Sequence, residues 1–306
     1  MCCDDIWCWS CCNVPRGTTV LPQALGSAAC STWNIAHSCL LKCYTTQRMK
    51  MKKTVAIVNQ KGGVGKTTTA INLAASLALS GEKILLVDLD PQGNTTSGLG
   101  IARTELPCTL YELLSGRCSI AEAAVSSSIE NLFVLSSSLD LLGAEIELVD
   151  REGRERVLSS VLEDAREGYR FIIIDCPPSL GLLTLNALVA AESVLVPVQC
   201  EYYALEGLGM LLRTVELIRG SYNPALEIEG ILLTMFDTRN NLSRQVEAEI
   251  KKHFGEKVYR TVIPRNIALG EAPSHGKPAI LYDIKSRGAQ SYLALAKEIL
   301  LEGSIG

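Results

Sequence analysis

The chain has 306 residues, of which 47% are hydrophobic and 20% are charged, and its formal net charge is −4. This is ample for a buried core, and one α/β domain of about 250 residues fits the length. The slightly negative charge argues against a protein that binds polyanions over its whole surface. No run of 18 uninterrupted apolar residues occurs, so no membrane-spanning helix is expected.

The first 48 residues differ in composition from everything that follows. They contain eight of the 12 cysteines and all three tryptophans. Cys8-x-x-Cys11 lacks a second pair at zinc-ligand spacing, and an acidic start with Pro22 in the apolar part does not fit a signal peptide. Met49-Lys50-Met51-Lys52-Lys53 looks like an ordinary bacterial start. We therefore expect residues 1–48 to be a disordered leader or a misassigned start, and residues 49–306 to form a single domain.

Four further cysteines are spread through the rest of the chain, at Cys108, Cys118, Cys176 and Cys200. Their isolation predicts free thiols with no disulfide framework, which suits a reducing compartment. The sequence is therefore expected to belong to a cytoplasmic protein.

Short apolar runs alternate with helix-sized stretches from residue 54 onward. The runs are continuous, as is typical of strands buried on both faces. They cover residues 55–58, 84–87, 132–135, 171–174, 194–196 and 231–233. The expected helices cover residues 70–79, 154–166, 182–191, 207–219, 244–253 and 290–301. This order predicts an α/β fold with a doubly wound, mostly parallel sheet, helices on both faces, and ligands at the carboxyl ends of the strands.

A glycine-rich stretch, Gln60-Lys61-Gly62-Gly63-Val64-Gly65-Lys66-Thr67-Thr68, joins the first strand to the first helix. Strand, glycine-rich loop and helix is the layout of a phosphate-binding loop. Glycines let successive backbone N–H groups turn toward an anion, and the helix adds its positive end. Lys66 supplies a charge for the β- and γ-phosphates, and the Thr67 hydroxyl can bind Mg²⁺. The residues from Lys61 to Thr68 are thus expected to bind a nucleotide.

Two carboxylates follow the second apolar run, in the segment Asp88-Leu89-Asp90-Pro91-Gln92. Residues two apart on a strand face the same side, so Asp88 and Asp90 are expected to lie together near the phosphate loop. The fourth apolar run ends in Asp175 and has the pattern of a Walker B strand, which brings one carboxylate close to the metal. We therefore expect Mg²⁺ at Thr67, Asp90 and Asp175.

Basic residues are concentrated near the C-terminus. Residues 239–287 carry 10 basic and five acidic side chains, a net charge of +5, whereas residues 49–238 have a net charge of −9. Charge directed at phosphates gives DNA binding that is independent of sequence and sensitive to salt. We expect Arg239, Lys252 and Arg287 to contact DNA; a plain solvated surface is the alternative reading of scattered charge.

Five motifs, in order, resemble those of the ParA/Soj family of partition ATPases over about residues 51–302. They are the deviant Walker A loop K-G-G-x-G-K-[ST] from Lys61, D-x-D-P-Q from Asp88, D-x-P-P from Asp175, I-P-R-N from Ile263 and E-A-P-S-H-G-K-P from Glu271. The resemblance implies an enzyme that hydrolyses ATP with Mg²⁺, forms a homodimer on ATP and binds DNA without sequence preference. It also implies a ParB-type partner that stimulates hydrolysis, association with the nucleoid, and either a chromosomal or a plasmid system.

The resemblance also assigns catalytic roles, to Lys61, Lys66 and Asp90. Lys61 would reach across the dimer interface to the partner's nucleotide, much as an arginine finger does. Asp90 would orient the attacking water. The segment Pro264-Arg265-Asn266 would contact the adenine, because the family's loop after the last long strand does so.

Three alternatives share parts of this pattern. A membrane-associated positioning ATPase of the MinD type would need a basic amphipathic C-terminal helix, whereas residues 291–302 hold one lysine and two glutamates. An iron–sulfur redox ATPase resembling the nitrogenase iron protein would need two well-placed cysteines in its switch segments. A nucleotide sensor without hydrolysis would not require the full set of catalytic and metal residues that this chain carries.

Overall fold

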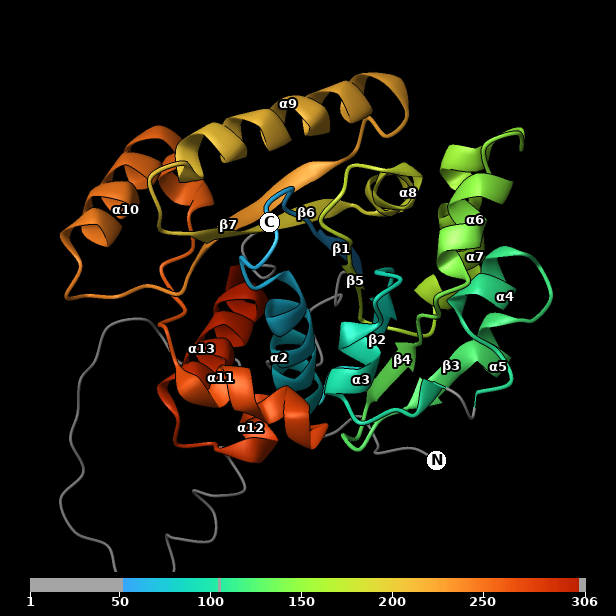
Figure 1. Ribbon diagram of the computed structural model, residues 1–306, viewed down its shortest axis with the longest axis horizontal. Helices are drawn as coiled ribbons and strands as arrows, with labels where there is room; N and C mark the ends of the chain where they lie inside the picture. The colour runs from blue at the N-terminus through green and yellow to red at the C-terminus, as the bar shows by residue number, and fades with distance from the viewer. Residues whose placement is uncertain (1–51, 104–105, 303–306) are drawn as a thin grey trace, which may run out of the picture. The chain divides into compact units, whose positions relative to one another are not determined.

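Figure 1 shows the computed structural model, which describes residues 52–103 and 106–302. The described residues fall within one compact unit. The expected leader, residues 1–48, lies outside the described residues, so its assignment and the domain boundary at residue 49 stay predictions.

A seven-stranded sheet, counted over the described residues, runs through the centre in the order β3-β4-β2-β5-β1-β6-β7. Its strands are β1 (Lys53–Ile57), β2 (Ile84–Asp88), β3 (Ala124–Ser126), β4 (Leu132–Leu135), β5 (Phe171–Asp175), β6 (Ser193–Gln199) and β7 (Glu227–Thr234). Neighbouring strands are parallel except for β3, which pairs antiparallel with β4 at one edge. The predicted doubly wound, mostly parallel sheet is therefore confirmed.

The strands are apolar throughout because the sheet is covered on both faces. All five residues of β2 and of β5 are buried. Along β1, Val55 and Ile57 belong to one core cluster, whereas Ala56 and the following Val58 belong to another. Each of the six predicted apolar runs coincides with a strand; β3 has only three residues and gave no pattern to detect.

Helices cover both faces of the sheet (Figure 1). The α-helices are α2 (Lys66–Leu79), α3 (Asn94–Gly98), α4 (Leu110–Leu114), α5 (Ile120–Ala123), α6 (Leu141–Glu147), α7 (Val157–Arg166), α8 (Leu182–Ala190), α9 (Ala204–Ser221), α10 (Asn241–Phe254), α11 (Ile267–Glu271), α12 (Ala279–Tyr282) and α13 (Arg287–Glu302). Single 3₁₀ turns lie at Arg154–Arg156, Gly255–Lys257 and Ala272–His275. The residues of α2, α12 and α13 share one core cluster, and those of α7 to α10 share the other.

The six expected helices are all present, although Arg154–Arg156 is a 3₁₀ turn that leads into α7. The helices that the sequence did not predict are α3, α4, α5, α6, α11 and α12, each of which has seven residues or fewer. Such short segments show less than two full turns of the 3.6-residue period, so the apolar pattern cannot reveal them. No helix in the described part of the chain has the length and hydropathy needed to span a bilayer.

Two of the cysteines expected to be isolated are paired. Cys108 and Cys118 form a disulfide, with Cα atoms 6.6 Å apart, so the prediction of free thiols is wrong for them. Each directly precedes the N-cap residue of a short helix, Thr109 for α4 and Ser119 for α5. The turn between these unpredicted helices brings the two thiols together. Cys176 and Cys200 are free, as expected, and both are buried.

Candidate functional site

The glycine-rich loop connects β1 to the amino end of α2 at the carboxyl edge of the sheet. Gly63 and Gly65 have φ angles of 73° and 89°. Residues that have a Cβ atom rarely adopt such positive φ angles. No side chain caps the amino end of α2, and its first turn contains no acidic residue. The first backbone N–H groups of this helix are therefore free to bind an anion, which the helix dipole also favours.

Lys66 is the first residue of α2, and its side chain is buried. Its Nζ donates to the carbonyl of Lys61 at 3.2 Å, so it bends back over the loop. Burial lowers the pKa of Lys66, while the nearby carboxylates of Asp175 and Asp90 act in the opposite direction. A buried cation above an uncapped helix end is suited to binding phosphate.

Asp88 and Asp175 end the neighbouring strands β2 and β5 as register partners. Asp175 Oδ2 accepts from the hydroxyl of Thr95 at 2.7 Å, and Asp88 Oδ2 accepts from the amide and hydroxyl of Thr96 at 2.8 and 2.6 Å. Burial, and then the charge of Asp175, raise the pKa of Asp88 to about 7. Burial likewise raises the pKa of Asp175 to about 6, against hydrogen bonds from Thr95 and Thr67. The hydrogen bonds to these two carboxylates thus hold α3 close to the sheet, but burial makes the charged form of each carboxylate unfavourable.

Asp90 lies two residues beyond the end of β2, so the expectation that it shares a strand with Asp88 is wrong. Its side chain is buried, and Oδ1 accepts from the amide of Gln92 at 2.9 Å in a turn. Ser137 donates to the Asp90 carbonyl at 2.5 Å. Backbone contacts therefore hold Asp90 in place. Its carboxylate is near enough to Lys66 to act in the direction that raises the pKa of that lysine.

The arrangement fits a Mg²⁺ ion. The Oδ1 atoms of Asp88 and Asp175 are buried and accept no hydrogen bond within the described residues. Thr67 is near enough to Asp175 to lower the pKa of its carboxyl group, so the predicted hydroxyl and carboxylate lie together. No group of three or more His, Cys, Asp and Glu in the described ranges has metal-site geometry. That is expected for Mg²⁺, which takes one or two protein oxygens and completes its shell with phosphate and water.

Lys61 starts the glycine-rich loop and contacts its own chain. Its amide donates to Asn59 Oδ1 at 2.9 Å, and its Nζ forms an ion pair with Glu201, which follows β6. The two side chains remain about half exposed, at 49% and 46%. Neither Glu201 nor the threonines that bind the carboxylates were predicted from the sequence. Thr95 and Thr96 lie three and four residues after the D-x-D-P-Q motif, but Glu201 lies 140 positions from Lys61.

A cavity of about 230 Å³ opens beside the loop. It is lined by the predicted segment Pro264-Arg265-Asn266 together with Gly65, Thr68 and Tyr292, among others. Thr234 ties β7 to the loop by donating to the Val64 carbonyl at 2.8 Å. The structure thus brings the predicted adenine segment to the phosphate loop, 200 positions away in the sequence.

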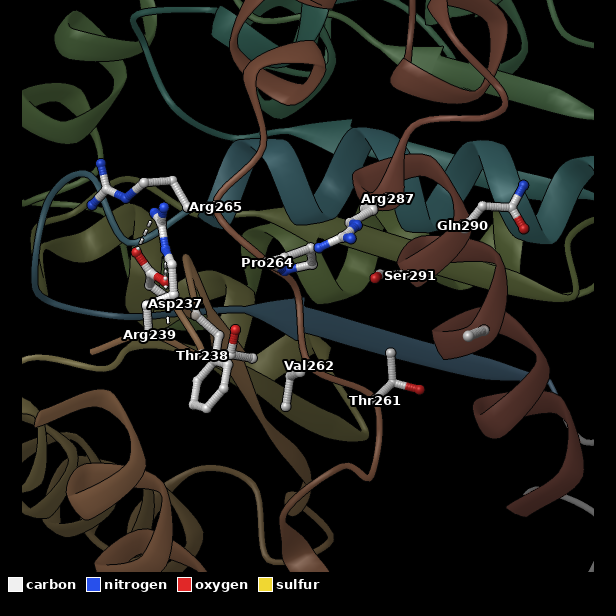
Figure 2. Close-up of a pocket in the computed structure, with 12 residues that line it drawn as sticks. Asp237, Thr238, Arg239, Thr261, Val262, Pro264, Arg265, Arg287, Gln290 and Ser291 are labelled. Atoms are coloured by element: carbon white, nitrogen blue, oxygen red, sulfur yellow. Dashed lines mark hydrogen bonds and ion pairs between the residues drawn. The ribbon is translucent and has the colours of Figure 1, made fainter. Parts of the chain in front are cut away.

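A second cavity, of about 740 Å³, contains two of the three predicted DNA-binding residues (Figure 2). Arg239, Arg265 and Arg287 line it together with Asp237. Arg239 binds Asp237 through Nε and Nη2, both at 3.0 Å, and these bonds lower the pKa of Asp237 to about 2. Lys252 does not line this cavity; it lies on α10, with Nζ 3.7 Å from Glu249.

Comparison with known proteins gives consistent results. A family model described as an AAA domain matches residues 52–228. The chain is 57% identical to the sporulation initiation inhibitor protein Soj of Bacillus subtilis, over 83% of this chain and 100% of that protein. It is 54% identical to the chromosome partitioning protein ParA of Caulobacter vibrioides, over 81% of this chain and 94% of that one.

Among solved structures, cobyrinic acid a,c-diamide synthase from Mycobacterium smegmatis with bound ADP and magnesium is similar at a TM-score of 0.74 and 39% identity. The match covers 84% of this chain and 97% of that one.

Proposed function

Because the chain belongs to the ParA/Soj family of chromosome-partitioning ATPases, we propose that it binds ATP with Mg²⁺ and pairs with a second copy when ATP is bound. The paired form would bind DNA without sequence preference, and a ParB-type partner would stimulate hydrolysis. The observation that carries this proposal is the uncapped amino end of α2, with buried Lys66 bent over the loop, Asp88 and Asp175 at the ends of the adjoining strands, and Asp90 in the turn after β2.

Each part of the nucleotide has residues suited to it. Lys66 and the loop amides bind the phosphates, as the charge and the free N–H groups favour. Thr67, Asp90 and Asp175 would hold Mg²⁺, which would neutralise charge on the phosphate oxygens. The segment Pro264-Arg265-Asn266 lines the cavity that would take the adenine. The site therefore combines phosphate, metal and base contacts at one edge of the sheet.

Hydrolysis needs a water in line with the γ-phosphate and extra positive charge in the transition state. Asp90 is the carboxylate that would orient this water, and its turn fixes it beside Lys66. Lys61 would supply charge to the partner's nucleotide, as expected for the family. Its position at the start of the loop and its half-exposed side chain support that role.

DNA binding would use the basic cavity of Figure 2. Arg265 lines both this cavity and the smaller one beside the loop, so nucleotide and DNA contacts adjoin. Two subunits side by side would present two such cavities, which would raise the number of phosphate contacts and the affinity. Association with the nucleoid would follow from this binding.

The alternatives receive less support. Tyr292, Leu295 and Ile299 of α13 are buried, and the Tyr292 hydroxyl lies 3.0 Å from that of Thr69, whereas Leu301 near the end of the helix is exposed. Most of the apolar face of this helix is therefore packed on the protein and is not free to bind a membrane. Of the four cysteines in the described residues, two are bonded to each other and two are buried, which does not suit a cluster shared between subunits.

Retention of DNA by the protein, with and without ATP and at two salt concentrations, tests the proposal. We expect retention only with ATP and a steep loss at the higher salt. Equal retention without ATP would contradict the proposed coupling of nucleotide to DNA.

A further inference from the structure

Lys61 is held at both its backbone and its side chain by its own subunit. Asn59 accepts from the Lys61 amide and donates from Nδ2 to the carbonyl of Pro197 at 2.7 Å, which ties the loop to β6. The Lys61 carbonyl accepts from Lys66. Its ammonium group forms an ion pair with Glu201. The amine that is expected to act on a partner's nucleotide is therefore already bound to a carboxylate.

Glu201 is itself firmly placed between β6 and α9. Its amide donates to the Gln199 carbonyl at 2.8 Å, and its own carbonyl accepts from the amide of Ala204, the first residue of α9, at 3.0 Å. The Gln199 side-chain amide donates to Glu201 Oε1, and Lys61 Nζ donates to Glu201 Oε2. Both carboxylate oxygens thus have partners within the same subunit, and these contacts orient the carboxylate toward Lys61.

These contacts compete with the role of Lys61 in trans. The Lys61 ammonium group has three N–H donors, and those that it gives to Glu201 are not available to phosphates in a neighbouring subunit. We propose that Glu201 is a positioning residue that holds Lys61 on its own subunit until a partner's bound ATP competes for the ammonium group. This inference rests on the proposed pairing of two ATP-bound subunits.

The exposure of the pair sets the size of the effect. Because both side chains are about half exposed, water and salt screen their attraction, and such pairs typically shift an equilibrium by no more than about fivefold. A dimer requires two such pairs to open, one in each subunit. Removal of the carboxylate should therefore tighten the dimer by up to about 25-fold.

Glu201→Gln tests this inference, because glutamine keeps the size and the Gln199 contact but removes the charge. Glu206→Gln is the matched control, since Glu206 is an exposed glutamate in the first turn of α9. The dimer dissociation constant of each protein is measured by sedimentation with Mg²⁺ and a non-hydrolysable ATP analogue. Circular dichroism melts check that both variants are folded.

We expect Glu201→Gln to dimerise more tightly than the wild type, with Glu206→Gln unchanged. Because the restraint is electrostatic, the difference between Glu201→Gln and the wild type should shrink at high salt. A Glu201→Gln dimer that is equal to or weaker than the wild-type dimer would overturn the inference while leaving the pairing intact. A wild-type protein that stays monomeric with the analogue would overturn the pairing itself, and the inference with it.

Discussion

Asp88 and Asp175 stand side by side at the ends of β2 and β5, and the carboxyl groups of both are buried. Each binds a threonine of α3 through one oxygen and leaves the other without a hydrogen bond from the described residues. Burial is the main reason why the pKa values of both are raised; the charge of Asp175 adds to the effect at Asp88, and the charge of Asp90 adds to it at Asp175. Burying these two carboxylates in their charged forms is therefore unfavourable, and a bound cation would stabilise the charged forms.

The nucleotide-free protein should lose stability as the pH rises through this range. The pKa values of Asp88 and Asp175 rise from 3.8 to about 7 and about 6 on folding. The folded state therefore binds more protons, and the free energy of unfolding falls between about pH 4 and pH 7. Thermal melts at pH 5 and pH 8 check this; a higher midpoint at pH 8 would contradict it.

Asp88→Asn should remove part of that pH dependence. An asparagine carbonyl can still accept from Thr96, but no charge is buried at neutral pH. We expect the midpoint at pH 8 to rise by about 5 °C or more, since each kcal/mol shifts a domain of this size by about 2–4 °C. Asp140→Asn, at an exposed aspartate, is the control. An Asp88→Asn midpoint at or below that of the wild type at pH 8 would refute the assignment.

Lys66→Ala should weaken ATP binding by about 10- to 100-fold, the usual effect of losing a hydrogen bond to a charged group. Calorimetric titration with ATP and Mg²⁺ measures this. Lys61→Ala serves as the comparison and should bind ATP almost as well as the wild type, because its amine contacts Glu201 and not the pocket of its own subunit. Equal losses in the two variants would show that the lysines are not functionally distinct.

Asp90→Ala should bind ATP but hydrolyse it poorly, and should give a long-lived dimer on DNA. The reason is that the attacking water loses its orienting carboxylate while the phosphate contacts remain. Single-turnover hydrolysis and the rate of release from DNA are the measurements. Normal turnover in this variant would rule out the role given to Asp90.

Arg239→Ala and Arg287→Ala should weaken DNA binding similarly for all sequences, because both arginines line the same basic cavity. Each should reduce the slope of log K against log salt by about one if it contacts one phosphate. Lys252→Ala should have a smaller effect, since Lys252 lies away from that cavity. A larger effect of Lys252 than of either arginine would place the DNA surface on α10 instead.

The fold could be predicted where burial leaves a strong pattern. Strands covered on both faces read as continuous apolar runs, so six strands and the longer helices were found from the sequence. The three-residue strand β3 and the short helices α3 to α6 leave no such pattern. The antiparallel edge and the Cys108–Cys118 pair were missed for this reason.

The same contrast between local patterns and tertiary contacts applies to the candidate site. The loop residues and Asp175 could be placed because they come after continuous apolar runs, residues 55–58 and 171–174, that mark strands. The pairing of Asp88 with Asp175 depends on which strands are neighbours, and the pairing of Lys61 with Glu201 joins residues that are 140 positions apart. No local pattern encodes contacts of this kind.

Mixing two variants tests the action of Lys61 in trans most directly. Lys61→Ala keeps the nucleotide pocket, and Lys66→Ala keeps Lys61, so only a mixed dimer contains one complete site. We expect ATP turnover in the mixture that clearly exceeds the sum of the rates of the two variants measured separately. A mixture no faster than that sum, under conditions where the two variants form mixed dimers, would contradict a site completed by the neighbouring subunit.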